Sequence, residues 1–246
     1  MLAEFAKGIW VDSGPVRILG TKLTATMTVL QLEEGLLVHS PLPLTPERRA
    51  VVLSLGKVAH LYAPNTFHHS WLGEWNREFP AARVHAPGPL AKKRPEVRID
   101  RFHDDGSSAF GDEVSEIPIV GFRLVETALV HRASGTAVVA DLVHNVGRPT
   151  DRWTKLYTTM MGFYDRVALS RVLRWTAFDD RRAARASVDR LLSVPFERLV
   201  VGHGTPIADR GQELLATALQ FLPPAEHARL PARSKSTPLL LGKPCG

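Results

Sequence analysis

The chain has 246 residues, of which 44% are hydrophobic and 23% charged, a composition that is ordinary for one globular domain with a substantial core. Its formal net charge of +6 comes from short basic runs without interleaved aromatic residues, which disfavours a nucleic-acid partner. The single cysteine, Cys245, excludes an internal disulfide and a thiolate metal cluster. Because no apolar run is long enough to span a membrane and the N-terminus lacks a signal-peptide pattern, we expect a cytoplasmic protein without a membrane partner.

The first elements predicted along the chain are a β-hairpin and a helix. Residues 22–32 alternate β-branched or apolar side chains with others, and a short turn containing Gly35 leads into the apolar run 36–38. Thr45, followed by a proline and an early glutamate, has the pattern of a helix N-cap, and Gly56 is placed to end that helix.

The next part of the chain predicts a strand, a histidine-bearing loop, a helix and a second strand. Residues 58–63 form a short apolar run that ends at a Pro-Asn pair and leads into a loop containing His68 and His69. A helix is expected to follow and to end near Phe79, before a strand over residues 82–86. This order is typical of a layered α/β arrangement.

The middle of the chain is rich in β-forming residues and is followed by helices. Residues 113–120, 122–130 and 136–142 predict consecutive strands of one sheet, separated by glycine-containing turns. The pattern becomes helical over residues 151–192, where Asp179-Asp180 opens an amphipathic helix.

The C-terminal part predicts a last strand, a tight loop and a closing helix. The strand covers residues 198–201, the loop contains His203, and the amphipathic helix covers residues 209–222. The basic, proline-rich tail of residues 223–246 is expected to be disordered. Residues 1–222 are therefore expected to form a single domain.

Polar side chains capable of binding a metal follow several of the predicted strands. His68 and His69 come after the strand at 58–63, Asp141 lies at the end of the strand at 136–142, with His144 just beyond it, and His203 follows the last strand. Ligands and metals bind where strand ends converge in layered α/β folds, and imidazole with carboxylate suits zinc, iron or manganese. For any one of these histidines, a structural hydrogen-bonded role explains the sequence about as well.

Five other histidines are interpreted as structural because they lie inside strands, in a loop or in the tail. They are His39, His60, His85, His103 and His227.

The motifs together resemble the metallo-β-lactamase superfamily. The similarity is carried by residues 63–69 (APNTFHH), 140–145 (ADLVHN) and 201–204 (VGHG), and it spans approximately residues 24–222. More narrowly, these segments resemble an uncharacterised branch of metallo-β-lactamase-like proteins, a domain of unknown function. The resemblance implies an α/β fold, a four-layer αββα sandwich, with a metal site at the strand ends.

The chain departs from the superfamily's first metal motif, His-x-His-x-Asp-His. When His69 is taken as the last member of this motif, Pro64 and Thr66 replace the two leading histidines, and His68 replaces the aspartate. Half of the first metal site is therefore missing.

The remaining ligand positions imply one divalent ion. Of the first site, the resemblance leaves His131 and the potentially bridging Asp141. The second site would be formed by His68, His69, Asp141 and His203. The expected cofactor is one zinc ion, with iron or manganese as alternatives, and Asp141 is the catalytic candidate that would orient the nucleophile or accept its proton.

The resemblance implies a metal-dependent hydrolase acting on a small-molecule ester, thioester, amide or phosphoester through activated water. Three alternatives stay open: a non-catalytic protein with a binding or scaffolding role, a mono-iron oxidoreductase and a nuclease. The identity of the substrate and the oligomeric state also stay open at this point, since one fold supports many chemistries.

Overall fold

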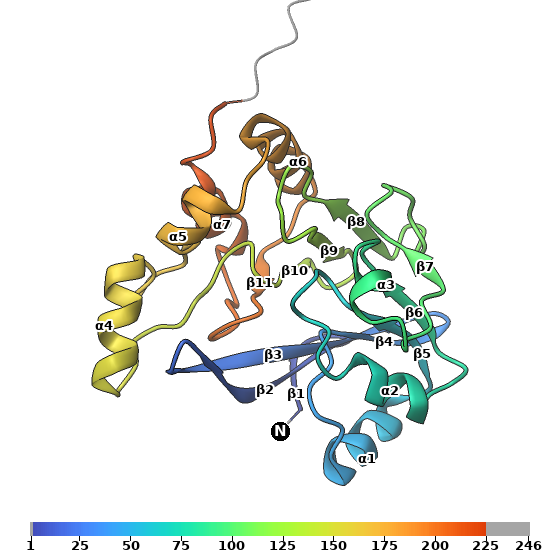
Figure 1. The fold of residues 1–246 in the computed structure, drawn as a ribbon. Helices are drawn as coiled ribbons and strands as arrows, with labels where there is room; N and C mark the ends of the chain where they lie inside the picture. Colours follow the sequence, from blue (N-terminus) through green and yellow to red (C-terminus); the bar gives the residue numbers. More distant parts are fainter. Residues whose placement is uncertain (1, 225–246) are drawn as a thin grey trace, which may run out of the picture.

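The computed structural model describes residues 2–224 and contains two β-sheets flanked by helices (Figure 1). The first sheet has seven strands in sequence order: β1 (Ala3–Ala6), β2 (Ile9–Ile18), β3 (Thr21–Leu32), β4 (Gly35–His39), β5 (Val58–Tyr62), β6 (Arg83–Ala86) and β7 (Arg101–Phe102). The second sheet has the order β11 (Arg198–Val200), β10 (Thr136–Val138), β9 (Thr127–His131) and β8 (Val114–Pro118).

The connections follow from the direction of the strands. Strands β1 to β4 pair antiparallel, whereas β4 to β7 pair parallel and need crossovers. The helices α1 (Pro46–Leu55), α2 (Leu72–Glu78) and α3 (Leu90–Lys93) provide these crossovers. In the second sheet, β10 and β11 are parallel, and α4 (Arg152–Met161), α5 (Arg171–Thr176) and α6 (Arg181–Ser193) lie between them in sequence; α7 (Gly211–Leu219) follows β11.

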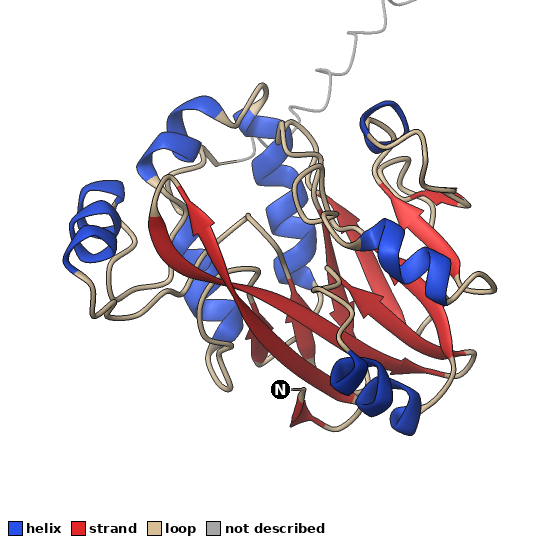
Figure 2. Ribbon diagram, turned by 60° about the horizontal axis from the view of Figure 1, so that its bottom comes forward, coloured by secondary structure: helices blue, strands red, loops and turns tan. Residues whose placement is uncertain are grey.

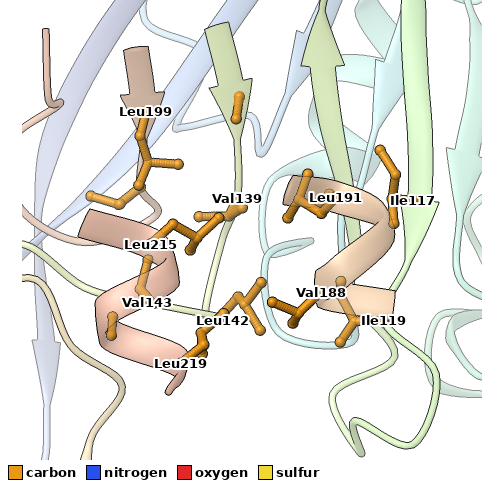
Figure 3. Packing of buried hydrophobic residues seen from close by; sticks show 14 of the residues in the cluster. Ile117, Ile119, Val139, Leu142, Val143, Val188, Leu191, Leu199, Leu215 and Leu219 are labelled. Atoms are coloured by element: carbon orange, nitrogen blue, oxygen red, sulfur yellow. The ribbon is translucent and has the colours of Figure 1, made fainter. Parts of the chain in front are cut away.

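Three apolar clusters hold the layers together. One lies between the two sheets and includes Leu30 and Leu37 from the first sheet and Leu129 and Val200 from the second. A second packs the outer face of the first sheet against α1 and α2. The third packs the outer face of the second sheet against α6 and α7, as the labelled side chains in Figure 3 show. The predicted αββα sandwich is therefore confirmed.

The hairpin of β2 and β3 contacts α4 at its far end. These two long strands extend beyond the rest of their sheet (Figure 2). The Lys22 amide donates to Thr154 Oγ1 at 2.8 Å, and Trp153 Nε1 donates to the Leu19 carbonyl at 3.2 Å. The hairpin and α4 therefore lie side by side.

Several predicted elements are confirmed with their expected boundary residues. The hairpin at residues 22–38 corresponds to β3 and β4, which pair antiparallel. The Thr45 side chain accepts from the Arg48 amide, as an N-cap does, and Gly56 ends α1. The strands and helix predicted between residues 58 and 86 are β5, α2 and β6.

Two segments differ from the sequence prediction. The run at residues 122–130 was expected to be one strand, but only β9 is a strand, because Val125 adopts a φ of 53° in a turn before it. The sequence analysis also missed β2, whose alternation is interrupted by Gly14 and Pro15. Beyond Val11 this strand pairs with β3 alone, and proline is tolerated on such an edge.

The predicted tail, apart from its first two residues, lies outside the described part of the chain, as does His227. Among residues 2–224, no helix has the length and apolar character that crossing a membrane requires.

Four of the histidines interpreted as structural are buried: His39, His60, His85 and His103. His60 Nδ1 lies 3.1 Å from His85 Nε2, and the His103 ring stacks on Tyr62 with centroids 4.6 Å apart. Burial and the neighbouring His60 lower the pKa of His85 to about 3, and burial lowers the pKa of His39 to about 3.

This burial predicts a fold that loses stability in acid. The pKa of such a histidine is lower in the folded chain than in the unfolded chain, where it is about 6.5. Its contribution to stability is therefore complete above a pH of about 6.5. The contribution is lost as the pH falls toward the folded value of about 3. Each such histidine should reduce the free energy of unfolding by up to about 1.4 kcal/mol per pH unit in that window. Urea titrations between pH 7.5 and 4.5 measure this slope. A His85→Asn variant should show a shallower slope, and an equal slope would contradict the assignment.

Candidate metal centre

Three side chains that follow strands converge at one end of the two sheets. They are His68, in the loop after β5, Asp141, after β10, and His203, after β11. One potential ligand atom from each lies within 4.8 Å of the others. Within residues 2–224, this is the one group of at least three histidine, cysteine or acidic side chains with metal-binding spacing. We call these three residues the His-Asp cluster.

The distances in the His-Asp cluster fit a shared divalent ion. His203 Nε2 and His68 Nε2 lie 3.3 Å and 3.4 Å from the same oxygen, Asp141 Oδ1. Bonds of roughly 2.0 to 2.1 Å in a tetrahedral zinc site place neighbouring ligand atoms about 3.3 to 3.4 Å apart. The spacing therefore matches two edges of such a tetrahedron.

The outer nitrogens of both histidines are already engaged. His203 Nδ1 lies 2.8 Å from the Thr24 carbonyl oxygen, which can only accept, so Nδ1 carries a proton. His68 Nδ1 lies 2.7 Å from Ser40 Oγ. The Nε2 atoms are thus turned toward Asp141, which is the arrangement of a metal-binding histidine whose other nitrogen is held by an outer partner. In neutral His203, whose Nδ1 carries the proton, Nε2 presents a lone pair to the carboxylate, and this arrangement favours a cation between them.

The pKa shifts in the His-Asp cluster favour charged groups. Burial by itself raises the pKa of the Asp141 carboxyl, but His68 and His203 hold it well below its usual range. Burial by itself lowers the pKa of His203, but the Asp141 carboxylate overcomes this effect and raises it. Both shifts favour a negatively charged Asp141 beside a positive charge at this position.

The loop that carries Asp141 is organised by the buried carboxylate of Glu126. Its two oxygens accept from the amides of Ala140 at 2.8 Å, Asp141 at 2.7 Å and Leu142 at 3.3 Å. Burial and the nearby Asp141 carboxylate raise the pKa of Glu126.

Asn65 connects the loops of His68 and Asp141. Its Nδ2 donates to Asp141 Oδ2 at 2.9 Å and to Glu126 Oε2 at 3.1 Å. Its Oδ1 accepts from the amides of Phe67 and His68, both at 2.9 Å. The sequence analysis missed Asn65 as a functional residue. An asparagine side chain that binds the amides two and three residues later forms a local turn, and an asparagine directly after a predicted strand could have indicated this role.

His203 needs the glycines on either side of it. A Cβ at Gly202 would lie 2.6 Å from the Ala140 carbonyl oxygen and 2.8 Å from the His68 ring. Gly204 has a φ of 104°, and a Cβ there would overlap the Asn145 carbonyl. Only glycine therefore lets this loop pack directly on the neighbouring loops.

The structure does not bring His69 into the His-Asp cluster, although it was predicted to be a ligand. Adjacent residues project in different directions, and His69 Nδ1 lies 3.0 Å from the Arg94 guanidinium. Burial, Lys93 and Arg94 together lower the pKa of His69 to about 4. His69 lines the cavity beside the cluster as a neutral side chain.

His131 lies at the opposite end of the second sheet from Asp141, so its prediction as a ligand of this site is corrected. It pairs with Thr136 at the start of β10, whereas Asp141 follows the end of that strand. Strand β10 ends at Val138 and Asp141 lies three residues beyond it, so His131 and Asp141 lie at opposite ends of this strand, and His131 is not part of the His-Asp cluster. His131 Nδ1 instead hydrogen-bonds to Ser134 Oγ at 2.8 Å.

A cavity of about 440 Å³ lies beside the His-Asp cluster, and all three cluster residues line it. His144 also lines it, with its ring centroid 5.5 Å from that of His203 and 5.3 Å from that of Phe163. Burial lowers the pKa of His144 to about 4. The cluster is thus placed where a small molecule can reach it.

Solved structures with the same arrangement of layers are metallo-β-lactamases and related proteins. A metallo-β-lactamase from Pontibacter korlensis superposes with a TM-score of 0.61 at 16% identity, over 90% of this chain and 98% of the other. One from Pseudomonas aeruginosa in its mono-zinc form gives 0.56 at 11% identity, over 90% and 95%. The chain has the metallo-β-lactamase fold.

The same metallo-β-lactamase fold relates the chain to a metal-soaked flavodiiron core from Synechocystis, with a TM-score of 0.60 at 11% identity, over 90% of this chain and 60% of the other. No protein-family model and no curated protein sequence matches the chain. The structural similarity confirms the fold that the sequence motifs implied. Because the sequence identities are low, it shows the fold alone.

The substitution Glu126→Gln should weaken metal binding. All four hydrogen-bond partners of the Glu126 carboxylate are donors, and the glutamine amide nitrogen, itself a donor, would face some of them. We expect about 10- to 100-fold weaker zinc binding, as for other residues that position ligands, and a loss of about 1 to 3 kcal/mol in unfolding free energy. Zinc titration by calorimetry and urea unfolding measure the two effects. Glu213→Gln, at an exposed carboxylate on α7, is the control; if both variants bind zinc like the original chain, Glu126 does not position Asp141.

Proposed function

We propose that this chain is a metal-dependent hydrolase with a single divalent ion, zinc foremost, held by His68, Asp141 and His203. The observation that carries the proposal is the pair of Nε2 atoms facing one carboxylate oxygen while both Nδ1 atoms are engaged elsewhere. Such an ion would supply Lewis acidity, making water nucleophilic near neutral pH and polarising a carbonyl.

The residues of the chain would fix the geometry of the reaction. Three protein ligands are the number found in catalytic zinc sites, which keep a further position for water or substrate. Asn65 holds Asp141 Oδ2, leaving Oδ1 toward the histidines. Because Asn65 occupies Oδ2 and both histidines face Oδ1, Asp141 suits the role of a ligand that orients the nucleophile better than that of a proton acceptor.

Iron redox chemistry is the second candidate, because two histidines and one carboxylate are also the ligand set of non-haem iron oxygenases. Similarity to a flavodiiron core favours keeping this candidate. Iron in the natively purified protein, with a coloured or paramagnetic sample, would support it over hydrolysis. A nuclease is disfavoured, because within residues 2–224 the cavity lining contains no lysine or arginine to bind phosphates.

Elemental analysis of the natively purified protein should find about one metal ion per chain, and His203→Ala should abolish it. His131→Ala is a matched control, because this histidine lies at the opposite end of the sheet and should leave the metal in place. Zinc-loaded protein should hydrolyse members of a panel of chromogenic esters, and the His203→Ala variant should not. Absence of metal from the original chain would instead favour a non-catalytic binding role.

A further inference from the structure

The cavity beside the His-Asp cluster has apolar walls from three separate parts of the fold. The hairpin of β2 and β3 contributes Val16 and Leu23, α4 contributes Met161, and α5 contributes Leu173. Leu42, in the loop between β4 and α1, forms another part of the wall. A substrate that fills this space must therefore present a hydrocarbon surface.

Large apolar side chains at the rim of the cavity are exposed to solvent. Leu19 is 75% exposed, Phe67 60% and Val172 50%, and all three line the cavity. Exposed apolar surface that continues into an apolar cavity is typical of a binding site for an apolar ligand.

The backbone conformation of Leu19 is also strained. It occupies the tip of the hairpin with a φ of 50°, directly before Gly20 with a φ of 80°. Such turns favour asparagine, aspartate or glycine, which tolerate positive φ and solvent. A leucine in this position is disfavoured both by its backbone angle and by its exposure, which indicates that its side chain is needed at the cavity.

The charge of the lining selects against ionic substrates. Although the chain has a net charge of +6, the described lining contains no lysine or arginine, and its single carboxylate is Asp141. A substrate carboxylate or phosphate lying along the walls formed by Val16, Leu23, Met161 and Leu173 would lose its hydration without gaining a charged partner from these side chains. The part of the substrate that lies against these walls is therefore uncharged.

We propose that the site takes an uncharged carboxylic ester whose acyl group is a medium-length hydrocarbon chain lying in this cavity. The proposal rests on the hydrolase function proposed above. In the reaction, the oxygen of water bonds to the carbonyl carbon and the bond from that carbon to the alcohol oxygen breaks. The alcohol oxygen takes one proton, and the products are a carboxylic acid and an alcohol, with no change in oxidation state.

The test compares p-nitrophenyl acetate, butyrate, octanoate and decanoate as substrates of the zinc-loaded full chain. Complete burial of one methylene is worth about fourfold in binding, so kcat/KM should rise at least tenfold from acetate to octanoate. The anionic p-nitrophenyl phosphate should not be hydrolysed. Equal kcat/KM for acetate and octanoate would overturn the proposal while leaving the hydrolase function in place.

A matched pair of variants tests the position of the acyl chain. Val172→Asp puts a charge at the rim of the cavity and should reduce the ratio of octanoate to acetate kcat/KM at least fivefold. Val120→Asp alters a valine of similar exposure, 52%, that does not line the cavity, and should leave the ratio unchanged. Equal ratios in the two variants would overturn the assignment of the cavity to the acyl chain.

Binding of the neutral dye N-phenyl-1-naphthylamine separates the cavity from catalysis. The dye should bind with or without zinc, and Val172→Asp should weaken its binding at least fivefold relative to Val120→Asp. Dye binding without hydrolysis of any ester by metal-loaded protein would overturn the proposed hydrolase function and the ester assignment together. Failure of the dye to bind would overturn the apolar character of the site.

Discussion

The arrangement of the site depends on one buried carboxylate, that of Glu126, which accepts hydrogen bonds from three consecutive amides after β10. These amides point inward where the strand ends and would otherwise be unpaired in the interior. Once they are bound, the loop holds Asp141 in one direction, and Asn65 extends the same network to the loop of His68. Two acidic side chains can lie side by side here because amides and histidines surround them on their other sides.

The histidines have different chemical surroundings in different parts of the molecule. Around Tyr62, the rings of His85 and His103 fill space between strands, and they stay neutral because burial lowers their pKa values. At the strand ends, the Asp141 carboxylate raises the pKa of His203, which is also buried. The adjacent carboxylate thus reverses the effect that burial has on His85 and His103.

The sequence predicted the sandwich and the three residues of the His-Asp cluster because strand periodicity, the N-cap Thr45 and the glycines around His203 are local signals. It predicted both His68 and His69 as ligands and favoured His69 from the family pattern, since which of two neighbours faces a site depends on the loop that Asn65 closes. It assigned His131 wrongly, because a family position does not specify which end of a strand a residue occupies. The role of Glu126 could not be recognised because three of its partners are backbone amides, which leave no trace in side-chain patterns.

The hairpin of β2 and β3 acts on the site in two ways. Its backbone, through the Thr24 carbonyl, orients His203, whereas its side chains Val16, Leu19 and Leu23 form part of the cavity wall. Every amino acid has the same carbonyl group, so substitutions along this hairpin can reshape the wall while the bond to His203 persists. Evolution can therefore alter which molecules enter the site without dismantling the centre that would act on them.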